Sequence, residues 1–211
     1  MNPKSKPKPK PKPAPLYDTD YYVFIGYGDD TCAKISKGPD LPSAYNNWRS
    51  GHIIKANIPE PLRYEIHEDD EGVMRPFFSA ESQPLMSDGI LEILFKCGVD
   101  NLDTYRAEIV ETRTEKIHVD YKAVNIIGLV AAAGEESETK SLGLGPDDSL
   151  VSSWFEKLVI SETKAHGFLM FRMAESVSIV IVHRKIKEAV ENANLPGVDK
   201  LDFIHPARWK G

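Results

Sequence analysis

The sequence predicts an α+β protein, in which a mainly antiparallel mixed sheet is packed by two amphipathic helices and connected by long loops. Two stretches, residues 84–98 and 186–193, place apolar side chains at helical spacing. Most other apolar runs are short and rich in β-branched and aromatic residues, and helices do not alternate with them regularly. This order of elements favours an α+β fold over a doubly wound parallel sheet.

A lysine- and proline-rich tail precedes the predicted domain. Residues 1–15 alternate lysine with proline, which removes amide donors, favours polyproline II and leaves little to bury. We therefore expect a disordered tail at residues 1–16 and a single domain over residues 17–206. Within this domain, residues 17–83 are a candidate β and loop subregion, and residues 84–206 are the candidate core.

The most clearly marked element is the helix in residues 84–98. Its apolar stripe consists of Met86, Ile90, Ile93, Leu94 and Cys97. Ser87 is placed to cap the first free amides, and Gly98 can adopt the left-handed conformation that ends a helix. The sequence thus predicts both ends of this helix.

A long strand is expected soon after this helix, at the centre of the fold. Residues 107–111 form a first strand with Ile109 directed inwards, and residues 112–116 turn the chain into the long strand at residues 121–133. Successive apolar residues in the long strand predict burial on both faces. We expect the helix to cover one of these faces.

The residues before the helix predict strands and loops. Short strands are expected at residues 21–25, 51–55 and 62–66. Residues 26–42 predict an exposed excursion because Gly, Asp, Lys and Pro dominate them. A helical turn over residues 43–50 would bring Trp48 to the body of the protein, and residues 68–72 form a strongly charged turn.

The C-terminal part begins with an acidic loop at residues 134–149, where no apolar periodicity is present. Its acidic side chains are Glu135, Glu136, Glu138, Asp147 and Asp148. After Trp154 and Phe155 re-enter the body, strands are expected at residues 157–161, 167–172 and 176–182. The second helix follows directly, and residues 195–197 stop it.

The predicted domain is distinctly acidic. The 211 residues carry 26 basic and 32 acidic side chains, and the tail holds five of the lysines and no acid. Residues 16–211 therefore carry 21 basic against 32 acidic side chains, a formal charge of −11. Such a charge repels nucleic acid and steers the protein towards basic partners. We expect no nucleic-acid binding beyond weak contact through the tail, which can also be a linker or a solubilising extension.

Cysteine content and hydropathy predict a cytoplasmic protein with no membrane contact. Only Cys32 and Cys97 are present, and the place of Cys97 on the helical stripe favours reduced, packed thiols over a disulfide. Cys32 falls in a predicted loop, where it can be exposed. No apolar run approaches the roughly 18 residues of a membrane span, and residues 1–15 lack the apolar core of a secretory signal.

No catalytic, cofactor or metal motif is found in the sequence. Gly26 and Gly28 follow a strand, but the third glycine and the amphipathic helix of a phosphate-binding loop are missing, so a turn is favoured. Histidines are scattered singly, and no zinc or calcium spacing is present. We expect no metal, no cofactor and no enzymatic activity. Because paired carboxylates assemble in space, a small enzyme of unknown class remains an alternative.

Several short segments, taken in order, resemble a known family. They are residues 21–23, Trp48 and Gly51, residues 84–87 and 99–101, Tyr121 with residues 124–126, and residues 157–160, 171–172 and 194–198. In order and spacing they resemble the bacterial immunity proteins encoded beside polymorphic toxins, specifically immunity family eleven, formerly a domain of unknown function. The resemblance covers most of residues 21–204.

This resemblance implies a cytoplasmic antidote that neutralises a cognate antibacterial toxin by stoichiometric inhibition. Acidic side chains would steer a basic toxin, such as a nuclease, to a fast encounter, and an aromatic anchor would set the dissociation rate. The candidate partner-binding residues are Glu68, Asp69, Asp70, Glu71, Glu135, Glu136, Glu138, Asp147, Asp148 and Trp154. Trp154 is the candidate anchor, and a buried core position is the favoured alternative for it. An adaptor acting through the basic tail is the other alternative function.

Overall fold

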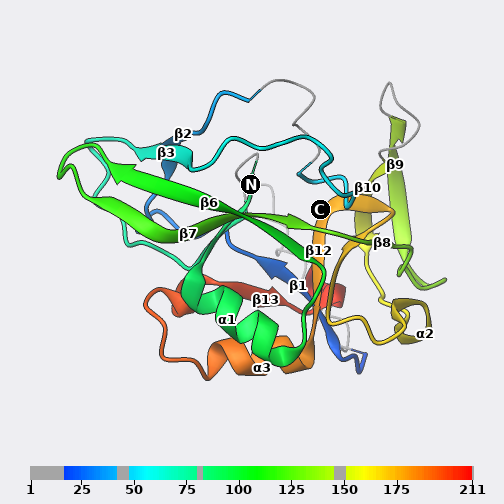
Figure 1. Ribbon diagram of the computed structural model, residues 1–211. Coiled ribbons are helices and arrows are strands. Elements are labelled where there is room, and N and C mark those ends of the chain that lie inside the picture. Colours follow the sequence, from blue (N-terminus) through cyan, green and yellow to red (C-terminus); the bar gives the residue numbers. More distant parts are fainter. Residues whose placement is uncertain (1–16, 42–47, 80–82, 145–150, 211) are drawn as a thin grey trace, which may run out of the picture.

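Two mixed, mostly antiparallel sheets and three α-helices make up the part of the chain that the computed structural model describes, residues 17–41, 48–79, 83–144 and 151–210 (Figure 1). The predicted α+β class is confirmed. The predicted Lys-Pro tail and most of the predicted helical turn at residues 43–50 lie outside the described residues. No helix in the described ranges is long and apolar enough to cross a membrane.

The larger sheet has seven strands in the order β13-β1-β12-β10-β9, with β11 also paired to β12 and β8 paired to β11. Their bounds are Tyr21–Ile25 (β1), Leu129–Val130 (β8), Glu138–Leu144 (β9), Val151–Lys157 (β10), Met170–Met173 (β11), Ser176–His183 (β12) and Asp202–Ile204 (β13). Only the contact between β8 and β11 is parallel in this sheet. The predicted strands at residues 21–25, 167–172 and 176–182 are therefore present, with small shifts at their ends.

The smaller sheet has six strands in the order β2-β3-β6-β7-β5-β4. Their bounds are Ile35–Lys37 (β2), Leu62–Ile66 (β3), Phe77–Phe78 (β4), Leu85–Ser87 (β5), Leu102–Glu111 (β6) and Ile117–Ile126 (β7). The predicted hairpin is the β6–β7 pair, and Ile109 is fully buried in it. Since β1 belongs to the larger sheet and β3 to the smaller, the residues before the first helix supply strands to both.

The helices are α1 (Asp88–Cys97), α2 (Glu162–Ala165) and α3 (Arg184–Glu191). The predicted caps of α1 are confirmed, because the Ser87 side chain accepts from the Ile90 amide and Gly98 has φ 100°. Met86 lies in β5, so the buried stripe of α1 starts at Ile90. In Figure 1, α1 and α3 lie side by side below the sheets. Their apolar faces join both sheets in one core, which contains Ile90, Leu94, Val124, Val180 and Ile186.

The predicted long strand at residues 121–133 is wrong, because the chain changes sheets within it. The strand β7 ends at Ile126, and β8 begins at Leu129 in the other sheet. Between them Gly128, at φ 108°, donates to the Gly51 carbonyl at 2.8 Å and accepts from the Arg172 amide at 3.2 Å. The sequence stays apolar across the change of sheets, because residues 123–126 are buried and residues 127–130 are half-buried.

Three other sequence predictions are corrected. Residues 134–149 are not only a loop, because β9 lies within them. An edge strand has one strand neighbour and much exposed surface, so it needs no apolar periodicity. Residues 51–55 form no strand, and the His52 carbonyl accepts from the Asn125 side chain at 2.8 Å instead. The strand expected at residues 157–161 lies earlier, since β10 ends at Lys157.

Candidate functional site

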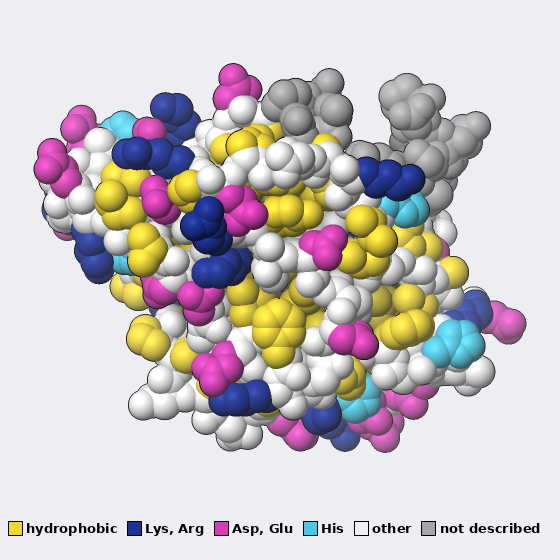
Figure 2. Space-filling view, viewed as in Figure 1, with side chains coloured by type: hydrophobic (Ala, Val, Ile, Leu, Met, Phe, Trp, Pro, Cys, Tyr) yellow, Lys and Arg dark blue, Asp and Glu magenta, His cyan; other side chains and the backbone are white. Residues whose placement is uncertain are grey.

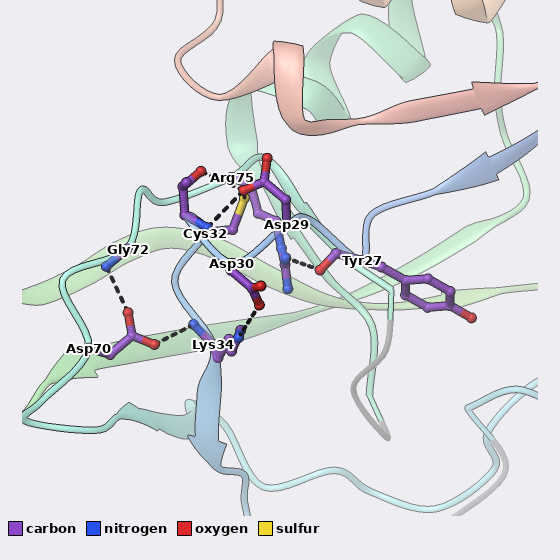
Figure 3. A network of polar contacts seen from close by, with 9 residues as sticks. Tyr27, Asp29, Asp30, Cys32, Lys34, Asp70, Gly72 and Arg75 are labelled. Carbon is purple, nitrogen blue, oxygen red and sulfur yellow. Dashed lines mark hydrogen bonds and ion pairs between the residues drawn. The ribbon is translucent and has the colours of Figure 1, made fainter.

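An acidic cleft, defined by residues 29–34 and 67–73, is the first candidate surface (Figure 3). Two segments meet here through a parallel bridge between Cys32 and Val73, with Ala33 N donating to the Val73 carbonyl at 3.0 Å. A Cβ on Gly72 would lie 2.3 Å from the Ala33 amide nitrogen. Only glycine permits this close approach. The residues of the two segments line a shallow, open cleft of about 600 Å³.

Asp70 fastens the two segments of the acidic cleft together. One of its carboxylate oxygens accepts from the Lys34 amide at 2.9 Å, and the other accepts from the Gly72 amide at 2.7 Å (Figure 3). Both bonds are charge-assisted and satisfy backbone donors. This predicted partner-binding residue is therefore already engaged in holding its own loop.

Asp29, which the sequence did not single out, has a comparable role. Its carboxylate accepts from the hydroxyl and the amide of Thr31 and from Lys200 Nζ at 3.1 Å. These hydrogen bonds, those of Thr31 first, hold the pKa of Asp29 below its ordinary value of 3.8. The Asp-x-Thr spacing is a local signal for such a turn, but Lys200 comes from a distant part of the chain.

The remaining carboxylates of the acidic cleft are mostly paired with nearby bases. Asp30 lies 3.1 Å from Lys34, Asp69 lies 3.4 Å from His67, and Glu71 is bonded to Arg113. Among the predicted carboxylates of this turn, Glu68 and Asp70 have no ion pair within the described residues, and Asp70 accepts from two backbone amides instead. Figure 2 shows acidic and basic side chains interspersed at the left end of the molecule, over the β6–β7 tip and the turn after β3.

Cys32 is buried at 1% exposure, which agrees with the favoured interpretation of a packed thiol and not with the alternative of an exposed one. The bridge to Val73 draws this residue inwards, and its Sγ lies 3.6 Å from an Asp29 carboxylate oxygen. A substrate approaching from solvent would not reach this sulfur.

The second candidate surface is the open hairpin, defined as residues 134–144 and 151–157. Trp154 is 46% exposed on β10, so the alternative of a buried core position is wrong. Its neighbour Phe155 is fully buried, because successive side chains of a strand point to opposite faces. Lys140 lies opposite Trp154 on β9 and is bonded to Glu156.

The described carboxylates among the predicted residues of the open hairpin are exposed to solvent. Glu135, Glu136 and Glu138 are exposed, and none of them has an ion pair within the described part of the chain. Asp147 and Asp148 lie outside the described residues. The backbone edge of β9 is also available, since β10 is its one strand partner in the described ranges.

The two acidic surfaces are far apart. In Figure 1 the turn after β3 lies at the left end of the molecule, and β9 lies at the right. The structure therefore does not join Glu68, Asp69, Asp70 and Glu71 with Glu135, Glu136 and Glu138 in one rim. A partner of ordinary size would contact one surface or the other.

The described side chains include no group of three or more His, Cys, Asp or Glu arranged to hold a metal ion. The exposed carboxylates of the acidic cleft can bind basic groups of a partner. The open hairpin, with its exposed carboxylates and Trp154, can bind both basic and apolar groups. No family model matches the chain, and no curated protein matches it.

Proposed function

We propose that this protein is a cytoplasmic antidote that binds a cognate toxin protein and neutralises it by stoichiometric association, without catalysis of its own. The resemblance to immunity family eleven implies this function. The observation that carries it here is Trp154, half-exposed on the same edge hairpin as three carboxylates that have no ion pair within the described residues. The open hairpin is the proposed toxin-binding surface.

Exposed carboxylates without bound bases are suited to steering a basic toxin. Their field acts at a distance, so it accelerates the encounter at low salt. Carboxylates of the acidic cleft would first have to leave Arg113, Lys34 or the backbone amides that they already bind. We therefore assign the steering role to Glu135, Glu136 and Glu138.

Trp154 is suited to anchor the complex. Tryptophan buries a large area with few rotatable bonds and is enriched among the residues that dominate binding energies. Next to it, the seven-residue strand β9 offers backbone donors and acceptors to an extended segment of the partner. Anchor, acidic side chains and strand edge lie on one hairpin.

The first experiment identifies the toxin and tests steering. The protein is used as bait in lysate of its source cell, and the captured toxin domain is purified for kinetics. The Glu135→Lys, Glu136→Lys, Glu138→Lys variant should associate about tenfold more slowly at low salt, with a weaker salt dependence. Glu68→Lys, Asp69→Lys, Glu71→Lys is the charge-matched control and should slow association much less. Equal slowing by both variants would remove the open hairpin from the interface.

The second experiment tests the anchor. Trp154→Ala should raise the dissociation rate about 30-fold, whereas Ile53→Ala, which truncates another exposed apolar side chain (63%), should leave it unchanged. Both variants should keep the wild-type melting temperature. A wild-type dissociation rate for the Trp154→Ala complex would contradict the role of Trp154 as the anchor.

A third experiment separates the antidote from an adaptor that works through its tail. Deletion of residues 2–15 should leave protection of toxin-expressing cells intact. Lost protection, with the toxin complex still formed, would favour the adaptor.

A further inference from the structure

A small chamber lies where β12 changes strand partners along one edge. β1 pairs with β12 as far as Val23, opposite Ile181, and β10 pairs with it at Ser176. β11 runs along the other edge of β12. Ile181 of β12 pairs with Val23 of β1 on one edge and with Phe171 of β11 on the opposite edge. Residues 177–180 therefore have no strand partner, within the described residues, on the edge that β1 and β10 share. In Figure 1, β1 diverges from β12 towards its arrowhead.

The chamber in this gap is small and mostly enclosed, with a volume of about 30 Å³. Its polar lining comes from Arg49, Arg172, Ser79, Ser178 and Trp209, and the other lining residues are mainly apolar. No carboxylate is found among the described residues that line it. The volume suffices for one or two water molecules, or for one monatomic anion.

Arg172 is the most deeply buried cation at the chamber, with 2% exposure. Its Nη1 donates to the Val177 carbonyl at 3.0 Å and its Nη2 to the Trp48 carbonyl at 3.2 Å, while its buried Nε has no hydrogen-bond partner in the described part. Burial first, and then repulsion from Arg49, lower the pKa of Arg172 to about 10. A buried charge normally has a counter-ion, and described side chains supply none here.

Two further donors line the same chamber. Arg49 binds the Ser79 carbonyl at 2.9 Å and adds a second positive charge. The indole nitrogen of Trp209 is buried without a hydrogen-bond partner in the described ranges. Positive charge and an unsatisfied N–H donor therefore surround a space that water or an ion can fill.

We propose that this chamber binds a monatomic anion of chloride size, held by Arg172 and Arg49, with the Trp209 indole as a further donor. The anion supplies a counter-charge to Arg172, for which no described side chain supplies one, at the junction where β1, β12 and the segment around Trp48 meet. It stabilises this junction. None of the described residues that line the chamber belongs to the open hairpin, so the two sites can be tested separately.

The test measures the melting temperature of the full chain at constant ionic strength while sodium chloride replaces sodium gluconate, whose anion is too large for the chamber. The melting temperature should rise saturably, by about 5–10 °C at one hundred times the dissociation constant. Bromide should act like chloride, and sulfate should not. Arg172→Met should abolish the rise, and Arg113→Met, a surface arginine paired with Glu71, should retain it.

Because Arg172→Met can fail to fold, line broadening of ³⁵Cl in nuclear magnetic resonance of the wild-type protein gives a direct reading. Competition by bromide, and loss of the broadening in Arg49→Met, would support the site. Broadening at the level of buffer alone, or a chloride response of the same size in the arginine variants and the wild type, would overturn it.

Discussion

The acidic cleft and the open hairpin both carry a net negative formal charge, but their carboxylates have different surroundings. In the acidic cleft, Asp70 and Asp29 accept backbone hydrogen bonds, and Glu71 is bonded to Arg113. On the open hairpin, Glu135 and Glu136 are exposed and have no ion pair within the described residues. The two sets of carboxylates thus differ in the donors around them. Those of the acidic cleft hold a loop together, and those of the open hairpin are exposed to solvent.

The difference follows from backbone geometry. Aspartates in tight turns lie within two residues of free amides and bind them, which rigidifies the turn. Glutamate has a longer side chain, and on an exposed strand it extends into solvent away from the backbone. The acidic cleft should therefore respond to substitution through stability, and the open hairpin through binding.

The largest expected effect is that of Gly72→Ala in the acidic cleft. The new Cβ would lie 2.3 Å from backbone atoms of Cys32 and Ala33, so the two segments must separate, at a cost of about 3 kcal/mol of unfolding free energy. The matched change on the open hairpin is Gly134→Ala, whose Cβ would lie 3.2 Å from Val159 Cγ1. It should cost less than about 1 kcal/mol. Urea denaturation measures both, and equal losses would remove the distinction.

Asp70→Ala should give the next largest loss, about 2 kcal/mol of unfolding free energy. It leaves the amides of Lys34 and Gly72 without their acceptor. Glu138→Ala removes an exposed carboxylate from the open hairpin and should change stability by no more than about 0.5 kcal/mol. A destabilising Glu138→Ala would mean that the open hairpin also relies on its acids.

A smaller effect is expected in the pH dependence of stability. Because the folded pKa of Asp29 lies below its ordinary value of 3.8, this group stabilises the protein above that pH, and the contribution is lost as the pH falls further. Asp29→Asn should therefore flatten the acid limb of stability against pH. Thr31→Val, which removes one of the two Thr31 donors, should flatten it partly. An acid limb unchanged in both variants would contradict the role of Asp29.

The smallest effect concerns the ion pair of Glu71 with Arg113. Both side chains are largely exposed, at 74% and 50%, so Glu71→Gln should cost about 0.5 kcal/mol or less. A double-mutant cycle with Arg113→Gln isolates the coupling, which should vanish in 1 M salt. A coupling that persists in high salt would indicate a tighter pair than its exposure implies.

Parts of the fold could be predicted from sequence because their causes are local. Ser87, the apolar stripe and Gly98 define α1 within a dozen residues, and the strands β1, β3 and β12 are short runs of strand-forming residues. The strand β9 was missed because an exposed edge strand needs no apolar pattern. Gly128 was missed because half-buried apolar residues lie on both sides of it and the apolar run continues past it.

The candidate site was predictable only in part. The charged turn at residues 68–71 and the acids of the open hairpin are visible in the sequence. The use of Asp70 as a brace is not, since the Lys34 amide that it binds lies 36 residues away. The exposure of Trp154 depends on which face of β10 packs on the core. Two neighbouring aromatic residues differ in this respect, since Trp154 is half-exposed and Phe155 is buried.

The sequence by itself determined the α+β class, both caps of α1, the acidity of the domain and the segments in which its carboxylates lie, because spacing, capping and charge are properties of short stretches. Only the tertiary structure decided that the apolar run after Tyr121 divides between two sheets at Gly128. It also decided that most carboxylates of the acidic cleft bind nearby donors while Glu135, Glu136 and Glu138 have no ion pair within the described residues, and that Arg172 is buried without a described counter-ion. These features depend on residues far apart in the chain, whose contacts arise when the sheets pack together.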